Sequence, residues 1–269
     1  MLAWIQVITL SLVQGVTEFL PVSSSAHLLL VPKLMGWPDQ GLEFDIAVHI
    51  GTLIAVLSYF RHELYLMLRD FLATLIGKPQ TQHSKLAWAI GLATIPVGLA
   101  GLYSKHLVEN SMRLHAVLII ACTTIIFGLL LGYASWRASC QRSEQNLTWR
   151  DILYIGCAQV LALIPGTSRS GITLTAGLIL GLNRQAAARF SFYLSIPVIL
   201  LAGGLQVVHM FAADMPIIWQ PLLLGIVISA VSAFCCIHLF LKLLAHIGLM
   251  PFVIYRLFLG GIILALLSQ

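Results

Sequence analysis

Residues 14–27 read QGVTEFLPVSSSAH and bring a carboxylate, three successive hydroxyls and an imidazole into one short stretch of a very apolar chain. Glu18 stands among apolar neighbours such as Val16 and Phe19. A charged side chain in such surroundings is costly, roughly 2.5 to 3.5 kcal/mol at the centre of a bilayer, and it marks a functional site by default. The alternative is that Glu18 only sits at a water interface. The stretch therefore predicts a polar functional site inside an apolar protein.

The composition indicates an integral membrane protein. Of the 269 residues, 59% are hydrophobic and only 9% are charged, whereas soluble domains carry about 25% charged residues. Long apolar runs joined by short polar stretches favour helices over the weak alternation of a β-barrel. No connection is long enough to hold a soluble domain. The net charge of +5 is modest, and we interpret it as a topology signal and not as a nucleic-acid footprint.

A second bend resembles the first. Residues 165–171 read PGTSRSG, and Pro165 follows Pro21 by 144 residues. This spacing aligns Ser24 with Ser168 and Ser25 with Arg169. One copy supplies an acid and an imidazole, and the other supplies a guanidinium. The pair predicts one site that is built from two halves of the chain.

The apolar runs fall into two similar halves. The runs at 2–13 and 152–164 are too short to cross a membrane, which takes about 20 residues, and each is followed by a polar break and a second short run. The predicted fold is a single all-α membrane domain over 1–269, with an inverted-topology repeat in which each half has one re-entrant helix-loop-helix and three transmembrane helices. The first repeat covers 1–134, with a hairpin at 2–36 and spans at 44–60, 86–104 and 114–133. The second covers 152–269, with a hairpin at 152–182 and spans at 190–212, 221–241 and 252–267.

Basic residues predict the orientation. Arg61, Arg69, Lys78 and Arg137 are among the many that fall in connections on one side of this topology. The side rich in basic residues is the cytoplasmic one. Both termini are then expected on the outer face, which is the periplasm in a bacterium.

Both bends carry more hydroxyls than helix capping needs. One Ser or Thr is enough to cap a helix, but each bend has three hydroxyl residues. Helix N-termini flanked by hydroxyls bind anions, and a guanidinium suits phosphate oxygens. Plain capping is the alternative to a phosphate cradle. The cradle residues expected are Ser23, Ser25, Gly166, Thr167, Ser168 and Ser170, with Arg169 as the cation.

Other polar residues add candidate chemistry. Gln14 and Glu18 lie four apart on one helix face, as oxygen ligands for Mg²⁺ or Ca²⁺ would. An imidazole at His27 beside the hydroxyl of Ser24 suits nucleophilic or acid–base chemistry. The alternative is a histidine that only satisfies a backbone carbonyl. His49 is a further candidate for lining the same cavity.

Arg256 is expected to be a buried charge in need of a partner. The candidates for that partner are Glu18, Glu43, Asp45 and a substrate phosphate.

These motifs resemble the two signatures of the undecaprenyl-diphosphatase family, the bacitracin-resistance type of bacterial lipid phosphatase. The resemblance covers essentially the whole chain, including FDIAVHIGTL and PFVIYR. It implies hydrolysis of undecaprenyl diphosphate to undecaprenyl phosphate in the bacterial inner membrane, which recycles the carrier lipid for the cell wall. It also implies dependence on a divalent cation, an inverted-repeat fold and, in many members, a dimer.

The resemblance also implies roles for single residues. The family's E/Q-x-x-x-E element falls on Gln14 and Glu18, its essential serine and histidine fall on Ser24 and His27, and its essential arginine falls on Arg169. Many relatives have Glu at the position of Gln14, so metal binding here depends more on Glu18.

The leading hypothesis is therefore a lipid diphosphate phosphatase with Glu18, Ser24, His27 and Arg169 as catalytic residues. Either Ser24 or His27 is the nucleophile, with Ser24 assisted by His27 the favoured choice. The alternative is a transporter or flippase of a phosphorylated polyprenyl lipid, because inverted repeats with broken helices are also typical of transporters.

Overall fold

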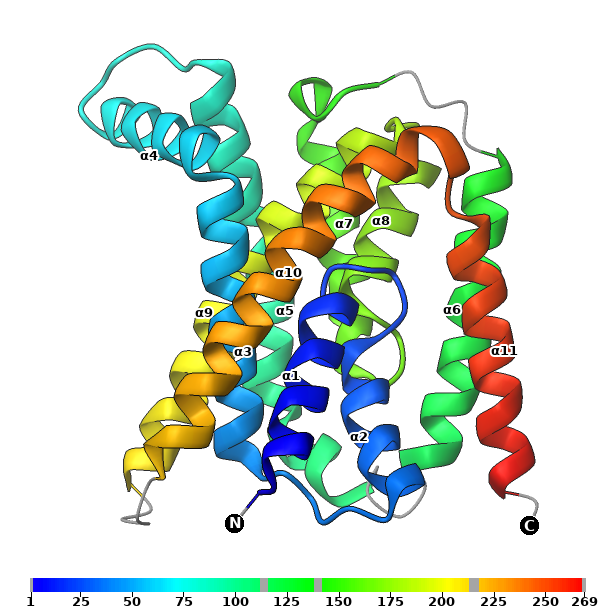
Figure 1. The fold of residues 1–269 in the computed structure, drawn as a ribbon. Coiled ribbons are helices and arrows are strands. Elements are labelled where there is room, and N and C mark those ends of the chain that lie inside the picture. The colour runs from blue at the N-terminus through cyan, green and yellow to red at the C-terminus, as the bar shows by residue number, and fades with distance from the viewer. Residues whose placement is uncertain (1, 112–115, 138–141, 213–217, 268–269) are drawn as a thin grey trace.

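The computed structural model describes residues 2–111, 116–137, 142–212 and 218–267, and its regular elements are all helical (Figure 1). Six helices in this described part are long and apolar enough to cross a membrane. They are α3 (Leu42–Tyr59), α5 (Gln82–Ser111), α6 (Ala116–Arg137), α9 (Arg184–Ala212), α10 (Trp219–Ile247) and α11 (Met250–Leu267). The all-helical, multi-pass membrane class is confirmed. The expected span 114–133 begins within 112–115, which lie outside the described residues.

The first short pair of helices forms a hairpin. Helix α1 (Trp4–Thr17) has 14 residues and is about 21 Å long, well short of a hydrocarbon core of about 30 Å. Helix α2 (Ser24–Met35) follows after a bend and packs beside α1. In Figure 1, α1 rises from the end that holds both termini to the middle of the bundle, and α2 returns to that end. The bend that carries Glu18 therefore lies in the interior of the protein.

The second short pair has the same plan. Helix α7 (Trp149–Val160) runs into the 3₁₀ turn η2 (Leu161–Leu163), and α8 (Arg169–Ile179) follows the bend. Its two ends meet, because the N–H of Arg142 donates to Gly181 O at 3.2 Å, and an Arg142 guanidinium nitrogen lies 2.6 Å from Asp151 Oδ2. The second pair of helices thus also forms a hairpin, with its two ends side by side.

The connection between the first two spans is itself a helix, α4 (Arg61–Leu75), which lies across the bundle end opposite the termini (Figure 1). The carboxylate of Asp70 in α4 accepts a hydrogen bond from Thr81 Oγ1 at 2.7 Å. This bond holds the connection between α4 and α5 against α4. Leu68 and Leu72 of α4 are exposed beside Arg69, so this surface helix carries both apolar and basic side chains.

Aromatic packing fixes the first bend against the spans. Phe19, the residue after Glu18, is fully buried and meets Phe192 of α9 edge to face at 5.2 Å. Phe60 and Tyr193 meet edge to face in the same core, with ring centroids 4.9 Å apart. Glycines let backbones approach closely, as small residues do between membrane helices. A Cβ on Gly15 would meet Ser229 O of α10 at 2.7 Å, and one on Gly156 would meet Ala93 O of α5 at 2.7 Å.

Candidate active site

The two bends meet inside the bundle. Arg169 of the second bend places Nη2 2.9 Å from Glu18 Oε1 of the first, and Ser170 Oγ donates to Leu20 O at 2.8 Å. The other guanidinium nitrogen, Nη1, donates to Ser191 O at 3.0 Å. Residues far apart in sequence thus form one site, as the paired motifs predict.

Glu18 is the hub of this site. Its Oε2 accepts hydrogen bonds from Ser24 Oγ at 2.7 Å and from Gln14 Nε2 at 3.0 Å, while Oε1 faces Arg169. The residue is only 9% exposed. A buried carboxylate needs such donors to remain ionised. Glu18 is therefore an anion that is already matched to a guanidinium.

Ser24 is directed at Glu18. Its hydroxyl is the donor in the 2.7 Å contact, because an ionised carboxylate only accepts. The arrangement of a hydroxyl donating to a carboxylate can transfer the serine proton directly to Glu18. The expected pairing of Ser24 with His27 is replaced by a pairing of Ser24 with Glu18.

The ring of His27 has two other partners. Nδ1 lies 2.7 Å from Ser23 O, and Nε2 lies 2.6 Å from the hydroxyl of Tyr255 on α11. The backbone-carbonyl contact is the one that the sequence leaves open as an alternative. Tyr255 was not identified from the sequence, although it lies inside the PFVIYR segment.

His49 approaches the same carboxylate from α3. Its Nε2 lies 3.7 Å from Glu18 Oε2, and its Nδ1 lies 2.7 Å from Asp45 O. A carbonyl can only accept, so Nδ1 carries a hydrogen. His49 thus lines the site, and its Nε2 attracts Glu18 when that nitrogen is also protonated.

The two bends share a rare backbone conformation. Ser23 and Ser168, which precede α2 and α8, have φ of 73° and 70°. Non-glycine residues seldom adopt positive φ, and such strain costs about 1 to 3 kcal/mol and concentrates at functional sites. Ser23 Oγ lies 3.2 Å from Ser25 Oγ, and Ser168 Oγ lies 3.2 Å from Ser170 Oγ.

This geometry corrects the sequence alignment of the bends by one position. Ser23 matches Ser168, and Ser24 matches Arg169, so the spacing between equivalent residues is 145 and not 144. The shared Pro misleads the alignment, because it stands at a different place in each bend.

The second bend packs tightly against α6. Gly166 has φ of 87°, and a Cβ there would meet Ile120 O at 2.7 Å, so only glycine fits. Thr123 Oγ1 donates to Pro165 O at 2.7 Å. Thr167 is fully buried, and its hydroxyl has no hydrogen-bond partner among the described residues. This hydroxyl is a donor that a bound anion could use.

Arg256 of α11 joins the bends from behind. It is fully buried, and the expected partners were Glu18, Glu43, Asp45 or a phosphate. The expected carboxylate partners are wrong, because the Arg256 guanidinium donates its hydrogen bonds to backbone carbonyls. The acceptors are Pro21 O at 3.2 Å, Gly166 O at 3.1 Å, Thr167 O at 3.0 Å, Thr124 O at 3.1 Å and Thr123 O at 3.5 Å. Arg256 therefore connects both bends to α6.

The surroundings of Gln14 show whether a divalent cation would fit beside Glu18. Its Oε1 is buried without a hydrogen-bond partner in the described part of the chain, while its Nε2 donates to Glu18. The described residues contain no group of three His, Cys, Asp or Glu side chains that could hold a metal ion. A free amide oxygen beside a carboxylate suits a hard cation, provided that other ligands come from phosphate or water.

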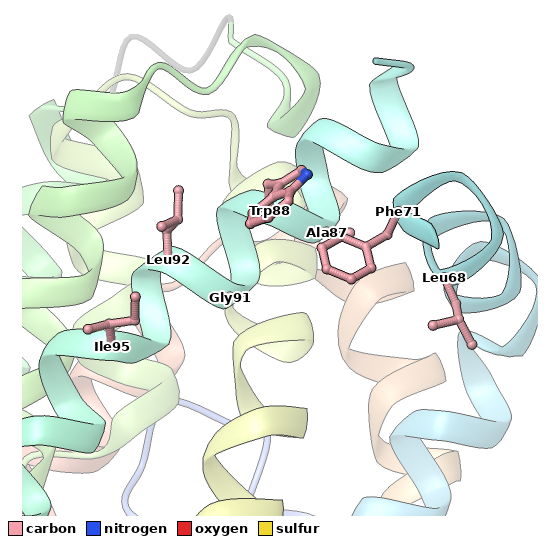
Figure 2. Close-up of a pocket in the computed structure, with 7 residues that line it drawn as sticks. All are labelled: Leu68, Phe71, Ala87, Trp88, Gly91, Leu92 and Ile95. Carbon is pink, nitrogen blue, oxygen red and sulfur yellow. The ribbon is translucent and has the colours of Figure 1, made fainter. Parts of the chain in front are cut away.

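A separate hollow lies between α4 and α5 (Figure 2). Its lining is apolar apart from the indole nitrogen of Trp88, which lies 3.3 Å from Thr74 Oγ1. It offers no ionisable side chain to a diphosphate. The hollow is lined by Leu68, Phe71, Ala87, Trp88, Gly91, Leu92 and Ile95.

Comparison with known proteins identifies the family. The family described as bacitracin resistance protein BacA matches residues 7–262. The chain belongs to this family. It is 57% identical to undecaprenyl-diphosphatase 2 of Stutzerimonas stutzeri, over 98% of each chain. It is 56% identical to an undecaprenyl-diphosphatase of Nitrosococcus oceani, over 98% of this chain and 99% of that one. A third relative, from Campylobacter concisus, is 52% identical over 97% of each chain and carries the same name. The matched residues include both bends.

Proposed function

We propose that this protein hydrolyses undecaprenyl diphosphate to undecaprenyl phosphate and inorganic phosphate. This activity recycles the lipid carrier for cell-wall synthesis and confers resistance to bacitracin. Relatives that match nearly the whole chain are named undecaprenyl-diphosphatases. The observation that carries the proposal is Glu18, which pairs with Arg169 and accepts the hydrogen bond of Ser24.

Ser24 is the nucleophile in this proposal. Glu18 accepts the Ser24 proton as Oγ attacks the terminal phosphorus, and the bond to the bridging oxygen breaks, so that undecaprenyl phosphate leaves. Water then attacks the phosphoserine, and Glu18 returns its proton to Ser24 Oγ as the bond from that oxygen to phosphorus breaks. Inorganic phosphate leaves with both hydrogens of the water. His27 remains the other candidate, but its ring nitrogens contact Ser23 and Tyr255.

Arg169 and the helix starts bind the phosphoryl oxygens. In the structure Arg169 is matched by the Glu18 carboxylate, and a phosphoryl group competes for the same planar fork. The N–H groups at the starts of α2 and α8 add partial positive charge. The residues that complete this cradle are Ser23, Ser25, Gly166, Thr167, Ser168 and Ser170. Donors fixed in advance stabilise the charge that develops in the transition state.

A divalent cation, Mg²⁺ or Ca²⁺, is part of the proposal. Gln14 and Glu18 would hold it, and the unpartnered Gln14 Oε1 supports this assignment. When bound, such a cation polarises phosphoryl oxygens and neutralises their charge. Chelation with EDTA should abolish phosphate release, and added Mg²⁺ or Ca²⁺ should restore it. Full activity in EDTA would remove the cation from the proposal.

The proposed membrane arrangement is an inverted repeat with two re-entrant hairpins. The paired short helices and their matching serines support it. The proposed location is the bacterial inner membrane, with the site open to the periplasm, and the basic connections of the opposite side support this orientation. A homodimer is proposed from the resemblance alone. The orientation can be tested by placing single cysteines at the ends of the chain and labelling them in intact cells.

Phosphate release from purified protein and the lipid diphosphate tests the function. The wild type should release phosphate with Mg²⁺ or Ca²⁺ present, and Ser24→Ala and Arg169→Ala should not. The exposed Arg150 gives a matched control, since Arg150→Ala removes the same charge away from the site. If the wild type releases no phosphate but moves the labelled lipid across a vesicle membrane, the transporter alternative is correct.

A further inference from the structure

Tyr255 and His27 form a close pair between α11 and α2. The tyrosine hydroxyl lies 2.6 Å from Nε2, and the two rings stack at 5.7 Å with an interplanar angle of only 7°. Tyr255 is followed by Arg256, whose guanidinium holds Pro21 O of the first bend. The tyrosine is thus fixed relative to the bend that carries the imidazole.

The partners of the two ring nitrogens settle which one carries the proton. Ser23 O can only accept, so Nδ1 of His27 is protonated and donates across 2.7 Å. In the neutral ring, Nε2 is then an acceptor, and the Tyr255 hydroxyl is its donor. Both nitrogens are therefore engaged without any contribution from Ser24, whose hydroxyl donates to Glu18.

We propose that Tyr255 is a positioning residue for the phosphatase reaction, whose hydroxyl occupies the Nε2 lone pair of His27 and holds the ring in one orientation. This proposal rests on the proposed function. With its lone pair occupied, His27 does not compete with Glu18 for the Ser24 proton. Without the tyrosine hydroxyl, Nε2 is free to seek other donors at the site, and fewer molecules have the productive arrangement.

Nitrogen NMR of ¹⁵N-histidine-labelled protein tests the contact directly. The His27 signals are assigned by their loss in His27→Ala. In the wild type we expect a protonated Nδ1 and an unprotonated Nε2 whose shift is that of a hydrogen-bonded acceptor. Tyr255→Phe keeps the stacked ring but removes the donor, so the Nε2 shift should move toward that of a free lone pair. Tyr154→Phe, which changes an exposed tyrosine on α7, should leave the His27 signals unchanged.

Kinetics test the consequence. Tyr255→Phe should lower kcat about tenfold, the equivalent of one lost hydrogen bond, with KM nearly unchanged. In the His27→Ala background the same change should have no further effect, because the tyrosine acts through the histidine. A role in packing alone predicts additive effects and an unchanged Nε2 shift. The unfolding temperature of Tyr255→Phe controls for folding.

Three results would overturn the proposal. They are a protonated Nε2 in the wild type at neutral pH, an Nε2 shift that Tyr255→Phe does not move, and a kcat that Tyr255→Phe does not lower. Failure of the proposed function has a different signature, namely a wild type that releases no phosphate. The NMR readout does not depend on activity, so the two failures are distinguishable.

Discussion

The two bends have the same backbone and opposite charges. Both enter the following helix through a serine with positive φ, and in both the serine hydroxyl lies 3.2 Å from that of the serine two residues later. The residue between those serines is Ser24 in the first bend and Arg169 in the second. At the position of Glu18 the second bend has Leu163, and at that of His27 it has Ile172.

This difference shows how the site divides its work. One bend provides the acid and the hydroxyl, and the other provides the guanidinium, so neither is complete by itself. The two hairpins remain alike at one earlier position: Gln14 and Gln159 are both fully buried, and both have an Oε1 without a hydrogen-bond partner among the described residues. The two bends share a positive-φ backbone at these serines and differ in the side chains around it.

The largest effect is expected from breaking the charge complementarity. Glu18→Gln and Arg169→Lys should each lower kcat by about 10² to 10³, since each removes a fixed charge or fork from the transition state. Exchanging the two charges, Glu18→Arg with Arg169→Glu, should not restore activity, because Ser24 would then face a guanidinium that cannot take its proton. Phosphate release measures all three. Activity in the exchanged variant would show that the bends are interchangeable.

The next effect concerns the residue that joins the bends. Arg256→Met removes the guanidinium that donates to five backbone carbonyls, and we expect a loss of about 3 kcal/mol or more in the free energy of unfolding. Arg256→Lys should be intermediate, because an ammonium has three donors and no planar fork. Denaturant unfolding in mild detergent measures this, with Arg150→Met as the control. Equal stability of wild type and Arg256→Met would contradict a joining role.

A smaller effect separates the two strained serines. Ser168 Oγ accepts from Gly171 N at 3.1 Å, whereas the Ser23 side chain makes no such cap. Both Ser→Ala changes keep the positive φ, so their difference reports the cap. Ser168→Ala should therefore be less stable than Ser23→Ala by about 1 kcal/mol, as measured by unfolding. The opposite order would mean that the Ser168 cap does not stabilise the second bend.

The smallest effect is a pH dependence confined to the second hairpin. Gln6 and Asp151 are equivalent positions of the two hairpins, since they are separated by the same 145 residues. Gln6 Oε1 accepts a hydrogen bond from Ala3 N at the start of α1, and Asp151 Oδ2 accepts one from Thr148 N at the start of α7. Burial raises the pKa of Asp151, but hydrogen bonds from Arg142 and Thr148 outweigh it and hold that pKa below its usual value.

A carboxyl group whose pKa is lowered by folding stabilises the folded state when the pH is above the pKa of the unfolded state, about 3.9. This contribution is lost as the pH falls through the lower pKa of the folded state. Asp151→Asn should lower the unfolding temperature at pH 7 and reduce its fall toward pH 3. Gln6→Ala should lower it equally at both pH values, because the amide does not titrate. Identical pH profiles for Asp151→Asn and the wild type would refute the assignment.

Much of this protein is determined by its sequence. The low charge content and the long apolar runs specify membrane helices, because charged groups are expensive in lipid. Runs too short to cross, broken by Pro and Ser, specify the two hairpins. Glu18, Ser24 and Arg169 stand out as candidate residues because they lie together at those breaks. A polar side chain in an apolar interior needs a polar partner, so such a cluster indicates a site.

Only the tertiary structure decides which group meets which. Sequence spacing suggested that Ser24 and His27 act together, but the bend directs Ser24 to Glu18 and α11 brings Tyr255 to His27. The partners of Arg256 could not be read from a list of carboxylates, because backbone carbonyls have no sequence signature. Contacts between segments more than a hundred residues apart depend on how helices pack, and packing is a property of the folded chain.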